Sequence, residues 1–243
     1  MEYLRLDGDA LTLVFALDGG GPKNGAADLA YLGARLPDDE DLAMLAAAAK
    51  RGRHESQPDA PPVPGLLPER KGGWSGTPAL GIRRGGLAVM TDLRLVTHDI
   101  QGGRIVLAYS DDVAGVSVHV QWRIGAGDVV TANLTLMNTG QTPIEVEHLA
   151  ALALPVPARF TQVTVFSGRW AAEMQEHRRA LVPDGLKRDS AIGKPGFRGG
   201  NWLIMHAGDE VLGAHLAWSG DQRLALEPDA QGAGDGRAML LMG

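Results

Sequence analysis

The sequence predicts an all-β protein, an antiparallel sandwich or barrel that carries one short helix. Much of the 243-residue chain alternates between apolar and polar side chains with a period of two, which is typical of strands with one face in a core and one in water. Turn residues are abundant, since the chain holds 33 glycines and 14 prolines. Short alternating segments separated by Gly/Asp turns favour a sandwich or barrel.

The clearest alternation lies between residues 116 and 136. The apolar residues of the segment 116–124 stand at every second position and include Trp122. A turn sequence GAGD follows at 125–128, and residues 130–136 alternate again. Two such segments predict a β-hairpin with one polar face, and they place Trp122 in the core. The same pattern predicts further strands at residues 3–6, 11–17, 93–100, 105–109, 144–152, 202–206, 211–218 and 223–227.

One segment departs from the period of two. Four acidic residues at 38–41 precede an Ala-rich run at 42–49, and Lys-Arg-Gly follows at 50–52. Acidic residues at the start and basic residues at the end favour a helix of about three turns. The next stretch, 57–65, carries four prolines, which neither a helix interior nor a central strand accommodates. It is expected to be an extended loop, with a domain linker as the alternative.

The apolar residues 238–242 predict a strand next to the C-terminus. Chain termini are usually solvated and frayed. We therefore expect a chain cut within a strand, whose partner is missing and whose edge is unpaired. The alternative is a final strand that lies inside a sheet.

Composition excludes several classes of function. The formal net charge is −6, which does not suit a general nucleic-acid binder that must neutralise phosphates. The absence of cysteine removes disulfides, thiol catalysis and thiolate zinc sites, and it fits a reducing compartment. Neither a signal-peptide pattern nor an apolar run of about 18 residues occurs. We expect a soluble, cytoplasmic chain without nucleic-acid or membrane partners.

No motif for a cofactor or a metal stands out. The glycine-rich stretches at 19–22 and 232–236 lack the flanking strand and helix of a phosphate-binding loop and predict turns. The seven histidines are scattered, and on an alternating strand His148 faces away from Glu145 and Glu147. His119 belongs to the polar face of the predicted hairpin, and a general acid/base role there, as in sugar mutarotation, stays open. Because no carboxylate pair is specified for glycosidic catalysis, we expect no cofactor, no metal and no catalytic residue in this chain.

Among the five tryptophans, Trp74 is the candidate for ligand contact. It lies in the glycine-flanked sequence KGGWSG at 71–76, where no strand would bury it. An indole on a loop can stack on the apolar face of a sugar ring. Packing within the loop is the alternative.

Four segments, in this order, resemble motifs of the N-terminal domain of glycoside hydrolase family 36 α-galactosidases. YLGARL at 31–36 is similar to the family's early W/Y-G-x-x-L segment, and LPE at 67–69 with the glycine loop is similar to L-P-x-E…G. SGRWAAE at 167–173 resembles G-x-W-x-R-E, and GAHLAWSG at 213–220 resembles G-x-x-L-x-x-S-G. Their order and spacing together carry the resemblance.

The resemblance implies a large antiparallel two-sheet β-supersandwich of the galactose-mutarotase-like kind, as a single domain over residues 1–243. In the family this domain precedes a (β/α)8 barrel that carries both catalytic aspartates. It also helps tetramers to form and sends a loop towards an active site. No strand–helix alternation of barrel length occurs in this sequence, so the barrel is expected in a further part of a longer glycosidase.

The resemblance also selects the candidate site residues. The family's loop aligns with residues 67–78, and where the family often has G-D-F-R before a proline this chain has WSGTP at 74–78. The family's sugar-binding arginine is therefore absent at the matching place, and Ala172 likewise replaces the arginine of G-x-W-x-R-E. Glu69, Arg70 and Trp74 become the candidate substrate-binding residues.

The resulting hypothesis is the N-terminal, non-catalytic domain of a retaining α-galactosidase-like hydrolase that cleaves terminal α-galactosides. Its partners would be an α-galactoside substrate, the (β/α)8 barrel of the same protein and further copies in a homo-oligomer. Two alternatives remain from other classes, namely a stand-alone carbohydrate-binding module and a mutarotase-like enzyme that uses a histidine and a glutamate.

Overall fold

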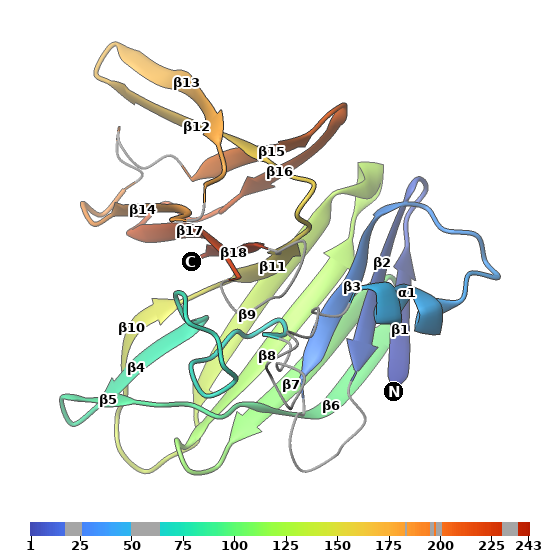
Figure 1. Cartoon of the computed structure of the whole chain (residues 1–243). Helices are drawn as coiled ribbons and strands as arrows, with labels where there is room; N and C mark the ends of the chain where they lie inside the picture. The colour runs from blue at the N-terminus through green and yellow to red at the C-terminus, as the bar shows by residue number, and fades with distance from the viewer. Residues whose placement is uncertain (18–25, 50–63, 183, 195–196, 198–200, 230–237) are drawn as a thin grey trace, which may run out of the picture. The chain divides into compact units, whose positions relative to one another are not determined.

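A computed structural model describes residues 1–17, 26–49, 64–182, 184–194, 197, 201–229 and 238–243 (Figure 1). Over these residues the chain forms five antiparallel sheets, one α-helix and one short 3-10 helix, so the predicted all-β class is confirmed. Internal contacts divide the chain into two compact units, Met1–Leu152 and Ala153–Gly243. No helix in the described ranges is long and apolar enough to cross a membrane.

The first unit contains three of the sheets. One has the order β1-β2-β3, with β1 at Glu2–Asp7, β2 at Leu11–Leu17 and β3 at Ala27–Ala34. The second has the order β6-β7-β8-β9, with β6 at Arg94–Gln101, β7 at Arg104–Asp111, β8 at Val116–Ile124 and β9 at Val130–Asn138. The third has the order β10-β4-β5, with β10 at Glu145–Leu149, β4 at Leu80–Arg84 and β5 at Leu87–Val89.

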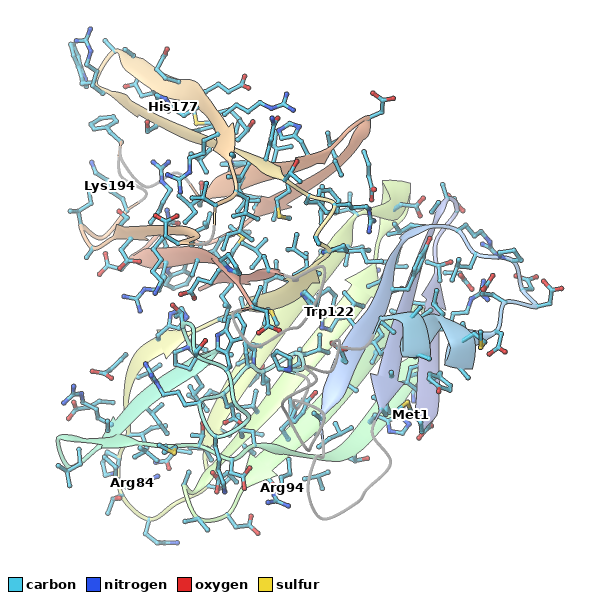
Figure 2. All side chains as sticks on the ribbon, viewed as in Figure 1. Met1, Arg84, Arg94, Trp122, His177 and Lys194 are labelled. Atoms are coloured by element: carbon cyan, nitrogen blue, oxygen red, sulfur yellow. The ribbon has the colours of Figure 1, made fainter. Side chains whose placement is uncertain are left out.

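The core of the first unit lies between two of these sheets. The apolar face of β8 is buried as its alternation predicts, and Trp122 is 2% exposed (Figure 2). Its ring meets Phe15 of β2 edge to face, with ring centroids 5.6 Å apart. Such an aromatic pair stabilises the fold by about 1 kcal/mol beyond the contribution of its buried surface area. On the opposite face of β8, His119 is exposed, as expected.

The one helix begins where the sequence predicts. Helix α1 spans Leu42–Ala48, and Oδ1 of Asp41 accepts hydrogen bonds from the backbone N–H groups of Ala43 and Met44 at 2.9 and 3.0 Å. These bonds satisfy two of the donors that a helix N-terminus leaves free. The helix has seven residues, fewer than the three turns expected. The basic residues at 50–52 and the proline stretch at 57–63 lie outside the described residues, as do both glycine-rich turns.

The second unit contains two four-stranded sheets. One has the order β11-β18-β17-β14, with β11 at Leu152–Val156, β14 at Leu186–Ser190, β17 at Gln222–Pro228 and β18 at Ala238–Met242. The other has the order β13-β12-β15-β16, with β12 at Gln162–Arg169, β13 at Ala172–Ala180, β15 at Trp202–Ala207 and β16 at Glu210–His215. The hairpin of β12 and β13 projects from its sheet, and β13 carries His177 (Figures 1 and 2).

The strand predicted at 238–242 is confirmed, but the expectation that one of its edges is unpaired is wrong. β18 lies between β11 and β17, and each of its five residues is at most 6% exposed. The apolar run is continuous because both faces of β18 are buried. The position of this strand inside a sheet agrees with the alternative expectation.

Candidate functional site

Backbone hydrogen bonds fix the loop that contains the three candidate residues to two other parts of the chain. The backbone N–H of Leu66 donates to the carbonyl oxygen of Ala27 in β3 at 2.9 Å. At the other end, the backbone N–H of Ala79 donates to the carbonyl oxygen of Pro68 within the loop at 2.9 Å. The carbonyl oxygen of Ala79 accepts a hydrogen bond from the backbone N–H of Ala150 at 2.8 Å. The loop is thus a structured element of the surface rather than a free tether.

Glu69 anchors the base of this loop. Its Oε2 accepts a hydrogen bond from the backbone N–H of Leu93 at 2.9 Å, and the Thr91 hydroxyl also bonds its carboxyl group. Its Oε1 is buried and has no hydrogen-bond partner in the described part of the chain. Burial raises the pKa of Glu69 to about 7, although the bonds from Thr91 and Leu93 lower it.

Further acidic and hydroxyl groups surround Glu69, and the sequence analysis missed them. Asp92 and Asp111 both raise the pKa of Glu69 by their charge. Asp111 itself accepts bonds from the backbone N–H groups of Asp92 and Ala114, at 2.7 and 2.9 Å. Tyr109 is 3% exposed beside Glu69, and burial raises its pKa. The alternation of β7 puts Tyr109 on its apolar face, which is the one sequence signal that pointed here.

Trp74 is packed inside the loop, not exposed on it. Its side chain is 2% exposed, its Nε1 donates to the carbonyl oxygen of Thr77 at 2.8 Å, and its backbone N–H bonds Glu69 at 3.1 Å. A Cβ at Gly76 would come within 2.6 Å of the indole, so glycine is needed there for the ring to fold over the chain. The expectation of an exposed indole is wrong because the loop forms a small core of its own.

Arg70 is the candidate that stays accessible. It is exposed at the turn where Gly73, with φ of 81°, reverses the chain. The adjacent Lys71 is held by an ion pair to Asp92, which also pairs with Arg94 at 2.9 Å. Both cations hold the pKa of Asp92 below its usual value, Lys71 most strongly. The structure therefore brings Glu69 and Trp74 together as supports and presents Arg70 at the surface.

The described residues do not assemble a group of three histidine or acidic side chains that could hold a metal ion. Glu147 of the Glu145/Glu147 pair instead forms an ion pair with Arg83 at 2.6 Å. The cross-strand neighbours of His119 are Ala108 and Thr135, neither of which is a carboxylate. His98 does lie 3.1 Å from Glu2, on the partly exposed edge of β6.

The fold and the loop define a sandwich-type β domain that presents a supported surface loop. The chain belongs to the glycosyl hydrolase family 36 N-terminal domain family, whose model matches residues 25–239. This confirms the resemblance on which the sequence analysis relied.

Individual relatives agree with this family. The α-galactosidase of Escherichia coli is 26% identical over 214 residues, which are 85% of this chain and 30% of the relative. The structure of the α-galactosidase from Lactobacillus brevis superposes with a TM-score of 0.82 at 17% identity, covering 99% of this chain and 36% of that one. The α-galactosidase AgaA A355E D548N of Geobacillus stearothermophilus, in complex with raffinose, gives 0.79 at 20% identity, with coverages of 100% and 37%.

These structural likenesses establish the β-supersandwich fold. The chain spans about a third of the length of the relatives it matches.

Proposed function

We propose that residues 1–243 form the N-terminal, non-catalytic domain of a retaining α-galactosidase-like glycoside hydrolase. The complete enzyme would hydrolyse terminal α-galactosides, with the catalytic aspartates on a (β/α)8 barrel outside these residues. The observation that carries this proposal is the family match over residues 25–239. The two compact units would together make up the single domain.

The role we propose for this domain is assembly of a homo-oligomer and completion of an active site. The loop supports the second part because Arg70 is exposed on a segment whose shape is held from below by Glu69 and Trp74. A guanidinium group carries five N–H donors in a rigid fork, which suits vicinal sugar hydroxyls. Arg70 would therefore contact the substrate, whereas Glu69 and Trp74 would position the loop.

We also propose a cytoplasmic location for the enzyme. A chain of this size without any cysteine fits a reducing compartment.

The deciding experiment compares this chain with the complete protein. The coding sequence should continue beyond Gly243 into a (β/α)8 barrel with aspartates at two strand ends. Purified 1–243 should release no product from an aryl α-galactoside, and the complete protein should do so. Turnover that follows 1–243 through purification and vanishes when one of its acidic residues is mutated would contradict a non-catalytic role, and a stop codon after Gly243 would favour the stand-alone binding module.

A further inference from the structure

On one face of the sheet β13-β12-β15-β16 the two inner strands bury Val163, Val165, Leu203 and Met205, each at most 4% exposed. His177 and Arg179 of β13 lie on the same face and are exposed. Since residues directly opposite in the register share a face, the other face can be read across the sheet. The sets of residues that lie opposite one another on it are Glu176 with Phe166, then Arg178 with Thr164, Ile204 and Gly213, then Ala180 with Gln162, His206 and Val211, and finally Trp202 with His215. We call this second set the outer face.

An aromatic pair stands at one end of the outer face. Trp202 is 45% exposed and stacks on His215 with ring centroids 3.9 Å apart and planes 17° from parallel. Asn201 holds the imidazole in place, because its Nδ2 donates both to Nε2 of His215 at 3.0 Å and to the carbonyl oxygen of Leu216 at 2.9 Å. His215 stacks on one face of the indole, and the Trp202 side chain still keeps nearly half of its surface exposed.

Polar side chains beside this indole are already oriented by one another. Oγ1 of Thr164 and Nε2 of His206 share a hydrogen bond of 2.9 Å, and Nε of Arg178 donates to Oε1 of Gln162 at 2.7 Å. Glu176 and Arg178 carry opposite charges two residues apart on the same face of β13. Thr164 is itself only 2% exposed, so it orients His206 from within the sheet. The accessible donors and acceptors of the outer face therefore come from Gln162, Glu176, Arg178 and His206, which together carry little net charge.

Gly213 leaves the middle of the outer face open. A Cβ at this position would meet no atom within 4 Å, and the φ of Gly213 is outside the region that requires glycine. A glycine inside a strand often marks a place where a ligand comes close to the backbone. Here it lies between Val211 and His215 on β16 and directly opposite Ile204 of β15.

We propose that the outer face of this sheet binds a neutral oligosaccharide, with one sugar ring stacked on the exposed part of the Trp202 indole. The C–H groups on one side of a pyranose ring meet the electron-rich face of an indole favourably, while its hydroxyls need the polar groups beside it. An uncharged ligand fits the balanced charge of Glu176 and Arg178. A stable protein–protein interface buries about 800 Å² of surface on each partner around an apolar core. Polar side chains interrupt the outer face, which makes it a poor match for such an interface.

The test is ligand-observed saturation-transfer NMR on the 243-residue chain with two probes, stachyose and maltotetraose. We expect saturable transfer to at least one of them, with a dissociation constant on the order of 1 mM. Trp202→Ala should weaken it about tenfold, as expected for the loss of one stacking contact. Trp170→Ala is the matched control, because Trp170 is 80% exposed on the turn of the β12–β13 hairpin and not on the outer face.

A second variant keeps the test valid if Trp202→Ala disturbs folding. Gly213→Val adds a strand-favouring side chain where there is space, so the melting temperature should be kept while bound sugar is excluded. The proposal is overturned if the wild-type chain transfers saturation to neither sugar, or if a folded Gly213→Val binds as well as wild type. It is also overturned if Trp202→Ala changes the molecular mass by light scattering while sugar binding is unaltered, since the face would then join protein chains.

Discussion

Glu69 accepts a hydrogen bond from the backbone N–H of Leu93 at 2.9 Å, and this contact ties the glycine-flanked loop to the segment that leads into β6. The same carboxyl group has a second oxygen that is buried without a partner. A buried carboxylate costs more than a buried carboxylic acid, so this support is strongest when Glu69 is protonated.

The first prediction concerns stability against pH. Since burial raises the pKa of Glu69 to about 7, the folded chain holds a proton that the unfolded chain releases near pH 4.3. The stability that this proton contributes is complete below about pH 4.3 and is lost as the pH rises towards 7. Glu69→Gln should remove this loss and be more stable than wild type at pH 8, by on the order of 2 kcal/mol. Urea unfolding at pH 4, 6 and 8 measures this difference.

The control for Glu69→Gln is Glu145→Gln, which alters an exposed carboxyl group on β10. This variant should follow the wild-type pH dependence between pH 4 and 8. If Glu69→Gln also follows it, Glu69 ionises normally and its burial does not matter to folding.

The second prediction concerns Trp74, for which the sequence left ligand contact and packing within the loop as the two alternatives. Because its indole is 2% exposed and bonded to Thr77, Trp74→Ala should destabilise the chain by about 3 kcal/mol or more. Trp170→Ala, at a position 80% exposed, should leave the melting temperature unchanged. Differential scanning calorimetry of both variants makes the comparison, and equal melting temperatures would mean that the loop core adds nothing to the fold.

The sequence predicted the strands best where one face is buried and the other is wet. The span 116–124 is β8 residue for residue, because Val116 to Ile124 alternates without interruption. β12 and β13 were missed for the opposite reasons. β12 alternates only over Gln162 to Val165 before Phe166 interrupts the pattern, which is too short to stand out, and β13 is exposed almost throughout and lacks apolar positions.

The candidate site shows a different limit. Glu69, Arg70 and Trp74 lie in one loop because they are close in sequence, but the environment of the Glu69 carboxyl depends on Thr91, Leu93 and Tyr109, which come from other segments. A glycine-flanked tryptophan looks exposed in a sequence. It is buried here because Gly76 lets the ring lie against the chain, a contact that no local pattern encodes.

The third prediction tests Arg70 in the complete enzyme and rests on the proposed function. If its guanidinium donates to a substrate hydroxyl, Arg70→Ala should lower kcat/KM several-fold, mainly through KM, which corresponds to about 1 kcal/mol of lost binding. Arg123→Ala, at an exposed position of β8, should keep wild-type kinetics. Steady-state kinetics with an aryl α-galactoside and with raffinose provide the measurement, and unchanged constants for Arg70→Ala would remove Arg70 from the active site.

The last prediction concerns β18, whose place in the sheet differs most from the sequence-based expectation. Its backbone bonds to β11 on one side and to β17 on the other, where Leu240 lies opposite Leu226. Both side chains are 0% exposed, so Leu240→Ala should lower the free energy of unfolding by about 2–5 kcal/mol, whereas Leu87→Ala at a position 75% exposed should change it very little.

Hydrogen exchange gives a test of the same strand that does not depend on a variant. In a strand paired on both sides successive amides all bond to neighbours, so the amides of 239–241 should exchange slowly together. Alternating fast and slow amides along these residues would show that one edge of β18 is open to water, and the unpaired edge first expected from the sequence would then be correct.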